Sequence, residues 1–448
     1  MKVAFVLMLA LVSLNSNSDT MQIPSDKDNT LFESNTVALS SGAGIYFFVG
    51  RTAQMDNSRR RGLLRFDLST IPAGSIINDA TLEITSSLNA ASSTQTLSLF
   101  SVNQDWGEST SDSTGTGGGG GGGNGTIAES GDATWTAPFH EIGSDWNTAG
   151  GDYNLTATAT ATAQGTGLVT FNSLNLTGDL QNWLDNPANN FGWIIIGNEA
   201  AASTAFRFNS RENTNNPPQL MVDFTPPPVT VQLNPAKDNT LFENPFGDTS
   251  NGAGGKLFAG KIQNATIRRG LLEFDVSSIP STATVSSVSI QLNVLNTPPG
   301  SSAGALNLHL ALAEWGEGSS VATGSGGGQP ANAEAGDATW LYTFYDDTTP
   351  LSWTNPGGDY AIDASATVNF GTSSGVLDIN STTDLIADVS TWIQNSNDNH
   401  GWVLVGDEAN NGNVRSFGSK ESGGTAPVLS IEYSISDLIF TNGFETNE

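Results

Sequence analysis

Cysteine is absent from this chain of 448 residues, and basic residues are scarce. Without cysteine the chain can form neither disulfides nor thiolate sites, although this absence does not assign it to a reducing compartment. Only 16 lysines and arginines stand against 45 acidic residues, which gives a net charge of −29. Such a charge repels nucleic acid and anionic lipid, so we expect no nucleic-acid partner.

Long hydrophobic runs are also missing beyond the first residues. Lys2 precedes an apolar run at 3–12, and Ser16 and Ser18 lie just before Asp19. A basic residue, a short apolar run and small residues are typical of a secretory signal peptide. The run is far shorter than the roughly 20 residues of a spanning helix, so we expect no membrane span. The sequence therefore predicts a signal peptide at residues 1–18 and a protein that is secreted or held at the cell surface.

The remaining sequence contains one long pattern twice. KDNTLFE occurs at 27–33 and again at 237–243, and RRGLLRFDLSTIP from Arg60 returns as RRGLLEFDVSSIP from Arg268. A period of about 200 residues is too long for a solenoid repeat, so each copy is expected to fold as a domain. All ten tryptophans pair between the copies: Trp106, Trp135, Trp146, Trp183 and Trp193 with Trp315, Trp340, Trp353, Trp392 and Trp402.

Short β-branched and aromatic runs, bounded by glycine, proline and asparagine, dominate both copies. Helical spacing extends over no more than a turn or two, at 177–184 and 384–393. This pattern predicts an all-β protein of two tandem antiparallel β-sandwich domains, jelly-roll-like in type. The predicted organisation is a first sandwich at 19–225, a proline-rich linker at 226–231, a second sandwich at 232–434 and a short C-terminal tail at 435–448.

The repeated motifs resemble a known family. RRGLLRFDLSTIPAGSIINDATLEI, D-W-G-E, G-D-A-T-W, W-N-T-A-G-G-D-Y and the ending F-N-S-R-E…P-P-Q-L-M-V-D-F are similar to the DNRLRE domain, an extracellular β-sandwich module of bacteria and archaea. The resemblance covers 22–224 and 232–433. It implies a relation to carbohydrate-binding modules, including alginate-binding ones, and so a binding or structural role instead of catalysis. No catalytic domain accompanies the pair.

Several aromatic and polar residues lie in glycine-rich, loop-like surroundings and could form a carbohydrate site. Indole and phenol rings there could stack on sugars while carboxylates and amides bind hydroxyl groups. The alternative is that the rings cover the sandwich beneath long loops. The candidates are Trp135, Trp146, Asn147, Asp152 and Tyr153 in the first copy, and Trp340, Trp353, Asp359 and Tyr360 in the second.

Repeated acidic residues near strand ends suggest structural calcium, although the chain has no required cofactor. Asp28 and Glu33, with their copies Asp238 and Glu243, offer the hard oxygen ligands that calcium prefers. The alternative is that these residues form turns. The acidic turns at 197–199 and 406–408 could likewise contribute, or their glutamates could pair with arginines.

The retained arginine pairs Arg60–Arg61 and Arg268–Arg269 could clamp a uronate carboxylate or instead pair with Glu212 and Glu421 within the fold. Since the net charge repels a polyanion, a neutral glycan is at least as good a ligand as alginate.

Catalysis is not expected, because the three histidines do not recur at matching positions and abundant carboxylates form pairs by chance. The sequence therefore predicts an exported, non-catalytic tandem that binds extracellular polysaccharide or acts as a surface or matrix component. The alternatives are a purely structural assembly protein and, third, an enzyme acting on polysaccharide. The terminal I-F-x-x-G-F-E segment resembles a short tail of exported Gram-negative proteins, which implies a sorting or anchoring partner.

Overall fold

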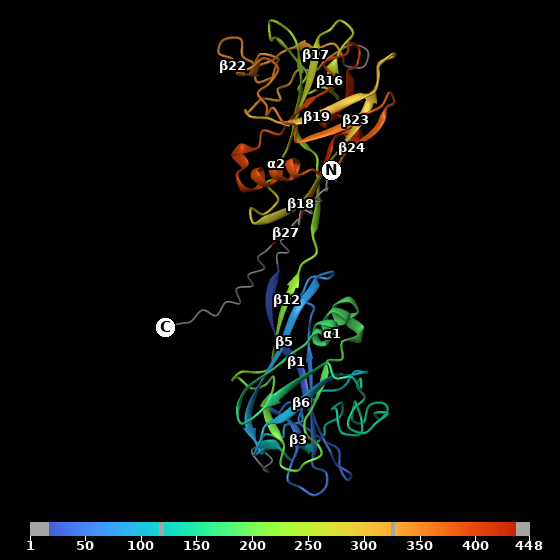
Figure 1. The fold of residues 1–448 in the computed structure, drawn as a ribbon, viewed down its shortest axis with the longest axis vertical. Helices are drawn as coiled ribbons and strands as arrows, with labels where there is room; N and C mark the ends of the chain where they lie inside the picture. Colours follow the sequence, from blue (N-terminus) through green and yellow to red (C-terminus); the bar gives the residue numbers. More distant parts are fainter. Residues whose placement is uncertain (1–17, 116–120, 324–327, 436–448) are drawn as a thin grey trace, which may run out of the picture. The chain divides into compact units, whose positions relative to one another are not determined.

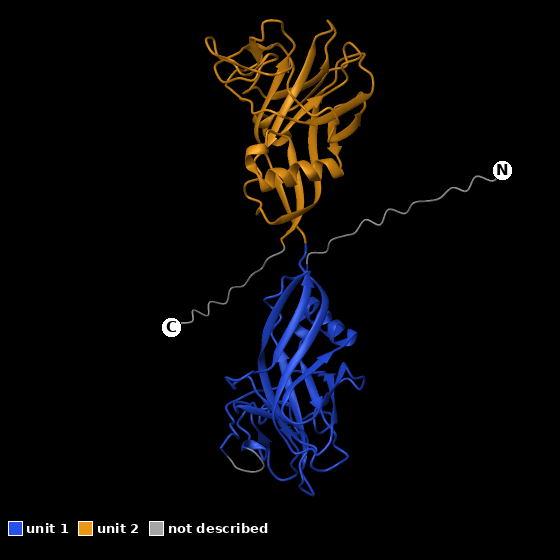
Figure 2. Ribbon diagram, turned by 60° about the vertical axis from the view of Figure 1, so that its left-hand side comes forward, with its two compact units in different colours: residues 1–227 blue, residues 228–448 orange. Residues whose placement is uncertain are grey.

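The structure, a computed structural model, describes residues 18–115, 121–323 and 328–435. The chain divides into two compact units, residues 1–227 and 228–448 (Figure 2). The boundary lies within Pro226–Pro228, and a strand already begins at Val229. The predicted linker at 226–231 was therefore too long, since 229–231 belong to a sheet. The predicted signal peptide and tail lie almost entirely outside the described residues.

Unit 1 is built from antiparallel strands in the order β1-β12-β5-β11-β3-β4-β10-β6-β8, with β9 on β5 (Figure 1). The first part of β1 pairs with β12 and the second part with β4, across a register shift between Ser25 and Lys27. One strand thus joins the two layers of the sandwich. The strands are β1 (Asp19–Phe32), β2 (Leu39–Ser40), β3 (Tyr46–Arg51), β4 (Arg59–Phe66), β5 (Ile76–Asn89), β6 (Gln95–Ser101), β7 (Thr126–Ile127), β8 (Ala159–Ala163), β9 (Gly167–Asn172), β10 (Trp193–Ile196), β11 (Phe206–Asn209) and β12 (Gln219–Thr225).

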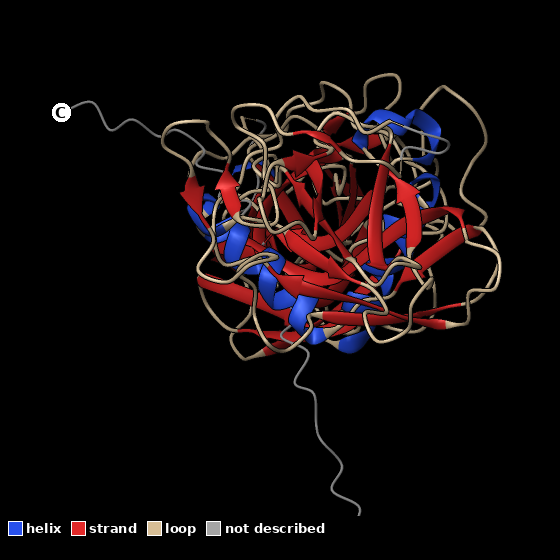
Figure 3. Ribbon diagram, turned by 90° about the horizontal axis from the view of Figure 1, so that it is seen from above, coloured by secondary structure: helices blue, strands red, loops and turns tan. Residues whose placement is uncertain are grey.

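Unit 2 repeats this topology in the order β13-β27-β18-β26-β16-β17-β25-β19-β23, with β14 on β17 and β24 on β18. Two strands replace β1: β13 pairs with β27 and β14 with β17. The strands are β13 (Val229–Leu233), β14 (Pro235–Phe242), β15 (Thr249–Ser250), β16 (Lys256–Lys261), β17 (Ile267–Phe274), β18 (Ala283–Asn296), β19 (Gly304–Leu310), β20 (Ala331–Asn332), β21 (Tyr342–Phe344), β22 (Leu351–Ser352), β23 (Ala366–Phe370), β24 (Gly375–Ile379), β25 (Trp402–Val405), β26 (Arg415–Gly418) and β27 (Val428–Ile435). The predicted all-β, antiparallel class is confirmed, with strands dominating both units (Figure 3).

The described residues of each unit form one α-helix, α1 (Leu174–Asp185) and α2 (Thr383–Gln394), and both are longer than the sequence pattern predicted. Ser173 and Thr382 cap their N-termini through side-chain hydrogen bonds to backbone N–H groups. The buried faces of the helices pack on the inner cores of the sandwiches. Short 3₁₀ turns complete the fold at Pro187–Asn189, Ser396–Asp398 and Lys420–Thr425.

Some strands are buried on both faces, which explains their continuous hydrophobic runs. On β4, Leu64 points into the inner core while its neighbour Leu63 points into a second cluster under the long loops. On β10, Ile195 and Ile194 divide between the same two clusters. Because successive strand side chains face opposite sides, the outer face of this sheet needs its own apolar cover.

Candidate functional site

The loop tryptophans supply that apolar cover. Trp135 and Trp146 are 6% and 5% exposed and pack with Leu31, Leu63 and Ile194. The Trp146 indole N–H donates to the backbone carbonyl of a buried threonine at 2.9 Å. In unit 2, the matching Trp340 and Trp353 are 9% and 5% exposed in an equivalent cluster. These four rings do not present an open face for a sugar, so the alternative, that they cover the sandwich, describes their placement.

The two candidate tyrosines lie half-buried beside the same tryptophans. The ring of Tyr153 contacts that of Phe100 in a tilted arrangement, with centroids 5.2 Å apart, and the ring centroid of Tyr360 lies 5.0 Å from that of His309. The guanidinium of Arg61 lies over Tyr153, and that of Arg269 lies over Tyr360. Their rings are therefore largely engaged within the fold.

Each tryptophan cover is fastened to the sheet by an arginine. Arg61 forms a bidentate pair with Glu199, at 2.7 and 2.9 Å, and donates to the Gly150 carbonyl at 2.8 Å. Its guanidinium also lies 4.9 Å from the centre of the Trp135 ring. Gly150 has φ +94°, and a Cβ there would lie 2.6 Å from the Arg61 guanidinium, so a side chain is excluded.

Arg269 repeats this arrangement in unit 2, with Glu408, Gly357 and Trp340. The pairing of Glu199 and Glu408 with arginines, one of the two sequence interpretations, is thus confirmed. The arginines Arg61 and Arg269 use these glutamates and not Glu212 and Glu421.

The carboxylates of Asp152 and Asp359 accept hydrogen bonds from residues of their own loops and so hold those loops in place. Asp152 accepts from the backbone and side-chain amides of Asn147, from Thr148 and from Gln104, at 2.8 to 2.9 Å. Asp359 accepts in the same way from the backbone N–H groups of two loop residues. Burial opposes ionisation of Asp359, but these hydrogen bonds lower its pKa. Asn147, Asp152 and Tyr153 nonetheless line an open hollow of about 280 Å³ in unit 1.

Glu33 and Glu243 cap strands and do not join Asp28 and Asp238. Glu33 accepts from the backbone N–H groups of Ser58 and Arg59 at 3.0 Å and pairs with the Arg59 guanidinium. Despite partial burial, these hydrogen bonds and the Arg59 charge lower its pKa. Glu243 accepts from the backbone N–H of Ile267 at 2.7 Å. The expected calcium set of Asp28 with Glu33, and of Asp238 with Glu243, was therefore wrong in its geometry.

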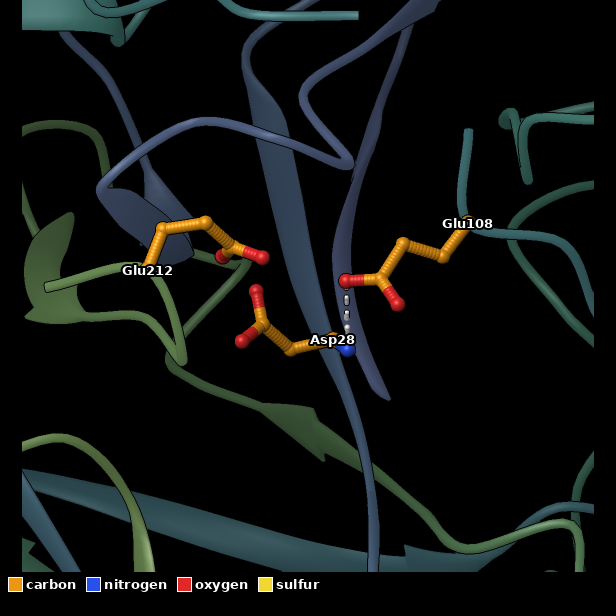
Figure 4. A group of neighbouring side chains, drawn as sticks. All are labelled: Asp28, Glu108 and Glu212. Carbon is orange, nitrogen blue, oxygen red and sulfur yellow. Dashed lines mark hydrogen bonds between the residues drawn. The ribbon is translucent and has the colours of Figure 1, made fainter. Parts of the chain in front are cut away.

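Asp28 instead meets two glutamates that the sequence analysis did not assign to a metal. One carboxylate oxygen from each of Asp28, Glu108 and Glu212 lies within 4.8 Å of the others. Figure 4 shows the two glutamates reaching Asp28 from opposite sides. Asp28 comes from β1, Glu108 from the loop after β6, and Glu212 from the turn after β11. We call these three residues the unit 1 carboxylate cluster.

Hydrogen bonds leave part of this cluster unsatisfied. Asp28 is fully buried; its Oδ2 accepts from the Arg211 backbone N–H at 2.6 Å, but its Oδ1 has no partner. Glu212 Oε2 is also buried without a partner. Glu108 Oε1 accepts from the Asp28 backbone N–H at 3.2 Å and from the Arg211 guanidinium at 3.2 Å. Unpaired oxygens of this kind are costly in a folded protein.

Burial and mutual repulsion disfavour the charged state of the cluster. Burial, followed by the charge of Glu212, raises the pKa of Asp28 well above its ordinary value. Burial raises the pKa of Glu108 to about 7, against which hydrogen bonds and the Arg211 charge act in the opposite direction.

Unit 2 has matching residues, Asp238, Glu317 and Glu421, our unit 2 carboxylate cluster, but among the described residues only the unit 1 oxygens all lie within 4.8 Å of one another. Glu317 accepts from the Asp238 backbone N–H at 3.0 Å, and Lys420 takes the place of Arg211. Asp238 Oδ2 accepts from the Lys420 backbone N–H, whereas the buried Oδ1 again has no partner. Burial, with the charges of Glu421 and Glu317, raises the pKa of Asp238 to about 8.

A cleft of about 490 Å³ lies elsewhere in unit 1, beside β3, β5 and β11. Leu88 is the exposed apolar residue of the cleft, whereas Phe48 and Phe206 of its lining are only 4% and 1% exposed. Gln54, Asn89, Asn124 and Arg207 supply amides and a guanidinium. The described residues that line it include no carboxylate. Gln54 donates to Asn124 across the opening at 3.4 Å, and the Arg207 guanidinium lies 3.8 Å from the centre of the Tyr46 ring.

The two copies differ at this cleft. Phe206 on β11 corresponds to Arg415 on β26, which is fully buried. The Arg415 guanidinium donates to the backbone carbonyls of Ser302 and Gly371 at 2.6 and 3.1 Å. A side chain that lines a cleft in unit 1 is thus replaced by one that ties loops together in unit 2. No sequence pattern singled out this cleft, because its lining comes from four separate segments.

None of the helices in the described part of the chain combines the length and hydropathy needed to cross a bilayer. The sequence matches no protein-family model, and no curated protein matches it significantly.

Proposed function

We propose that this chain is an exported, non-catalytic tandem of β-sandwich modules that binds an extracellular, uncharged polysaccharide through the cleft of unit 1. Export rests on the signal-peptide-like N-terminal sequence. The C-terminal tail is proposed to bind a sorting or anchoring partner. The resemblance to the DNRLRE domain, carried by the repeated motifs, supports a binding module.

The observation that carries this proposal is the chemistry of the cleft. Its exposed Leu88 can contact the C–H face of a sugar, and its three amides can both donate to and accept from hydroxyl groups. Since the described lining has no carboxylate, the cleft does not offer the acid pair that glycoside hydrolysis uses. The net charge of −29 repels anionic polymers at long range, and this favours an uncharged ligand over a polyuronate.

Affinity electrophoresis of the full chain through gels containing neutral or anionic polysaccharides tests the proposal. We expect retardation in at least one neutral polymer, weaker retardation in alginate, and its loss in Gln54→Ala combined with Asn124→Ala. Both side chains are exposed, so the thermal transition should be preserved.

Asn147→Ala is the matched control, because Asn147 is an exposed loop amide outside the cleft. It should retain binding. Unretarded wild-type protein in every polymer would reject glycan binding and favour a purely structural surface component. Release of reducing sugar from a polymer that retards the protein would instead favour the third alternative, an enzyme acting on polysaccharide.

A further inference from the structure

We propose that each unit binds one calcium ion, through Asp28, Glu108 and Glu212 in unit 1 and through Asp238, Glu317 and Glu421 in unit 2. The proposal is independent of glycan binding. It replaces the sequence-based set that included Glu33 and Glu243.

The unpartnered oxygen of a fully buried aspartate carries this inference. Asp28 and Asp238 are both 0% exposed, and Oδ1 of each lacks a hydrogen-bond partner. A buried carboxylate that is neither paired nor hydrogen-bonded on one oxygen is rare, because its desolvation is uncompensated. The same atom is left without a partner in both copies. A cation bound at Oδ1 would satisfy it in each unit.

Charge in the unit 1 carboxylate cluster points to a divalent ion. Three carboxylates surround one guanidinium, that of Arg211, which leaves an excess of two negative charges when all are ionised. Lys420 leaves the same excess in the unit 2 carboxylate cluster. A divalent cation neutralises this excess. Lys27 also interacts electrostatically with Glu108, but its ammonium group forms its ion pair with Asp105.

The chemistry of the ligands favours calcium over magnesium. In unit 1 the three ligand oxygens lie within 4.8 Å of one another, a spacing that either ion can bridge. Calcium accepts irregular sets of carboxylates completed by water, whereas magnesium demands near-ideal octahedral geometry. Glu212 and Glu108 are 21% and 10% exposed, so the cluster is open to solvent on one side.

Isothermal titration of calcium chloride into chelator-treated full-length protein tests the proposal directly. We expect two ions per chain, weaker binding of magnesium, and a higher melting temperature in calcium than in chelator. Glu108→Gln and Glu317→Gln should each remove one ion, and the double variant should remove both. Glu33→Gln, which changes the acidic residue directly after β1 and outside the cluster, should still bind two ions.

Asp28→Asn separates ion binding from a merely structural role. The amide removes the buried charge, so we expect this variant to melt above wild type in chelator and to lose the response of unit 1 to calcium. The proposal fails if wild type gives neither heat nor a shift in melting temperature with calcium. It also fails if magnesium binds as tightly, or if Glu108→Gln and Glu317→Gln retain both ions.

Discussion

Single polar residues explain much of the repeated sequence. In KDNTLFE, the Asn29 side chain accepts from the backbone of Thr30 and Ser41 and from the Ser40 hydroxyl, and it donates to the Gly107 carbonyl. Asn239 makes the corresponding contacts in unit 2. These asparagines are fully buried and hold the loops over the sheet. An aspartate could not replace them, because it lacks the amide donor.

Replacing Trp146 or Trp353 with alanine tests the placement of the loop tryptophans. Since both rings are buried, we expect each variant to lose about 3–5 kcal/mol of unfolding free energy. Chemical denaturation of the full chain measures this loss. Ile142→Ala, an exposed residue of the same loop region, should change stability little. If Trp146→Ala lost less than about 1 kcal/mol of unfolding free energy, the Trp146 ring would have to be exposed and could stack on a sugar.

At the scale of elements, the loops that join the strands carry most of the polar organisation. The connection between β6 and β8 brings Trp106, Glu108, Trp135 and Trp146 to the outer face of one sheet. The turn after β11 brings Arg211 and Glu212 to β1. Each carboxylate cluster therefore depends on two separate loops reaching one strand, and the burial that results shifts the pKa values of the cluster.

The raised pKa of Asp238, about 8, predicts how stability changes with pH in chelator. Its pKa is higher in the folded than in the unfolded chain, where it is near 3.8. The stabilising contribution of the protonated group is therefore complete below about pH 4 and is lost as pH rises through about 8. Glu317, Glu421 and Lys420 face the same carboxyl group and act on this titration. The unfolding free energy of wild type minus that of Asp238→Asn, measured in chelator, should therefore decrease between about pH 4 and about pH 8.

Asp407 provides the control of opposite sign. It is in the same unit, and hydrogen bonds from Asn410 and Asn413 lower its pKa despite partial burial. Its contribution is present above the unfolded pKa and is lost only at acidic pH. The difference between wild type and Asp407→Asn should thus be constant across neutral pH. If the difference in unfolding free energy between wild type and Asp238→Asn were also constant with pH, burial would not raise the pKa of Asp238 as described.

At the scale of the whole molecule, the chain consists of two units with separate cores. The inner core of unit 1 contains Trp183 and Trp193, whose rings lie 4.6 Å apart, and that of unit 2 contains Trp392 and Trp402 at 4.5 Å. Each unit also has its own helix and its own loop-covered second cluster. These are the features of domains that can fold alone.

We therefore expect polypeptides 19–227 and 228–435 each to be soluble and to unfold cooperatively. In calorimetry of the full chain, Trp146→Ala should lower one transition and Trp353→Ala the other. A single transition that both variants shift equally would show that the units fold together. Aggregation of both isolated polypeptides would support the same conclusion.

The sequence alone determined the repeat, the all-β class, the approximate strands and the division near Pro226–Pro228, because these follow from local periodicity and from comparison of the copies. It underestimated the helices, since Ser173 and Thr382 lengthen them at the N-terminus and their stability comes from packing. It also gave no means to separate a buried tryptophan in a glycine-rich loop from an exposed one.

Tertiary structure alone decided which polar residues meet. Asp28 and Glu33 are close in sequence, yet alternation along β1 and a partner from β4 direct Glu33 to Arg59. Glu108 and Glu212 are distant in sequence and reach Asp28 only when their loops close over the sheet. Carboxylates are common in this chain, so their types alone did not identify the cluster. The physical reason is that burial and convergence, which set the charge balance of a site, arise from contacts between segments far apart in the sequence.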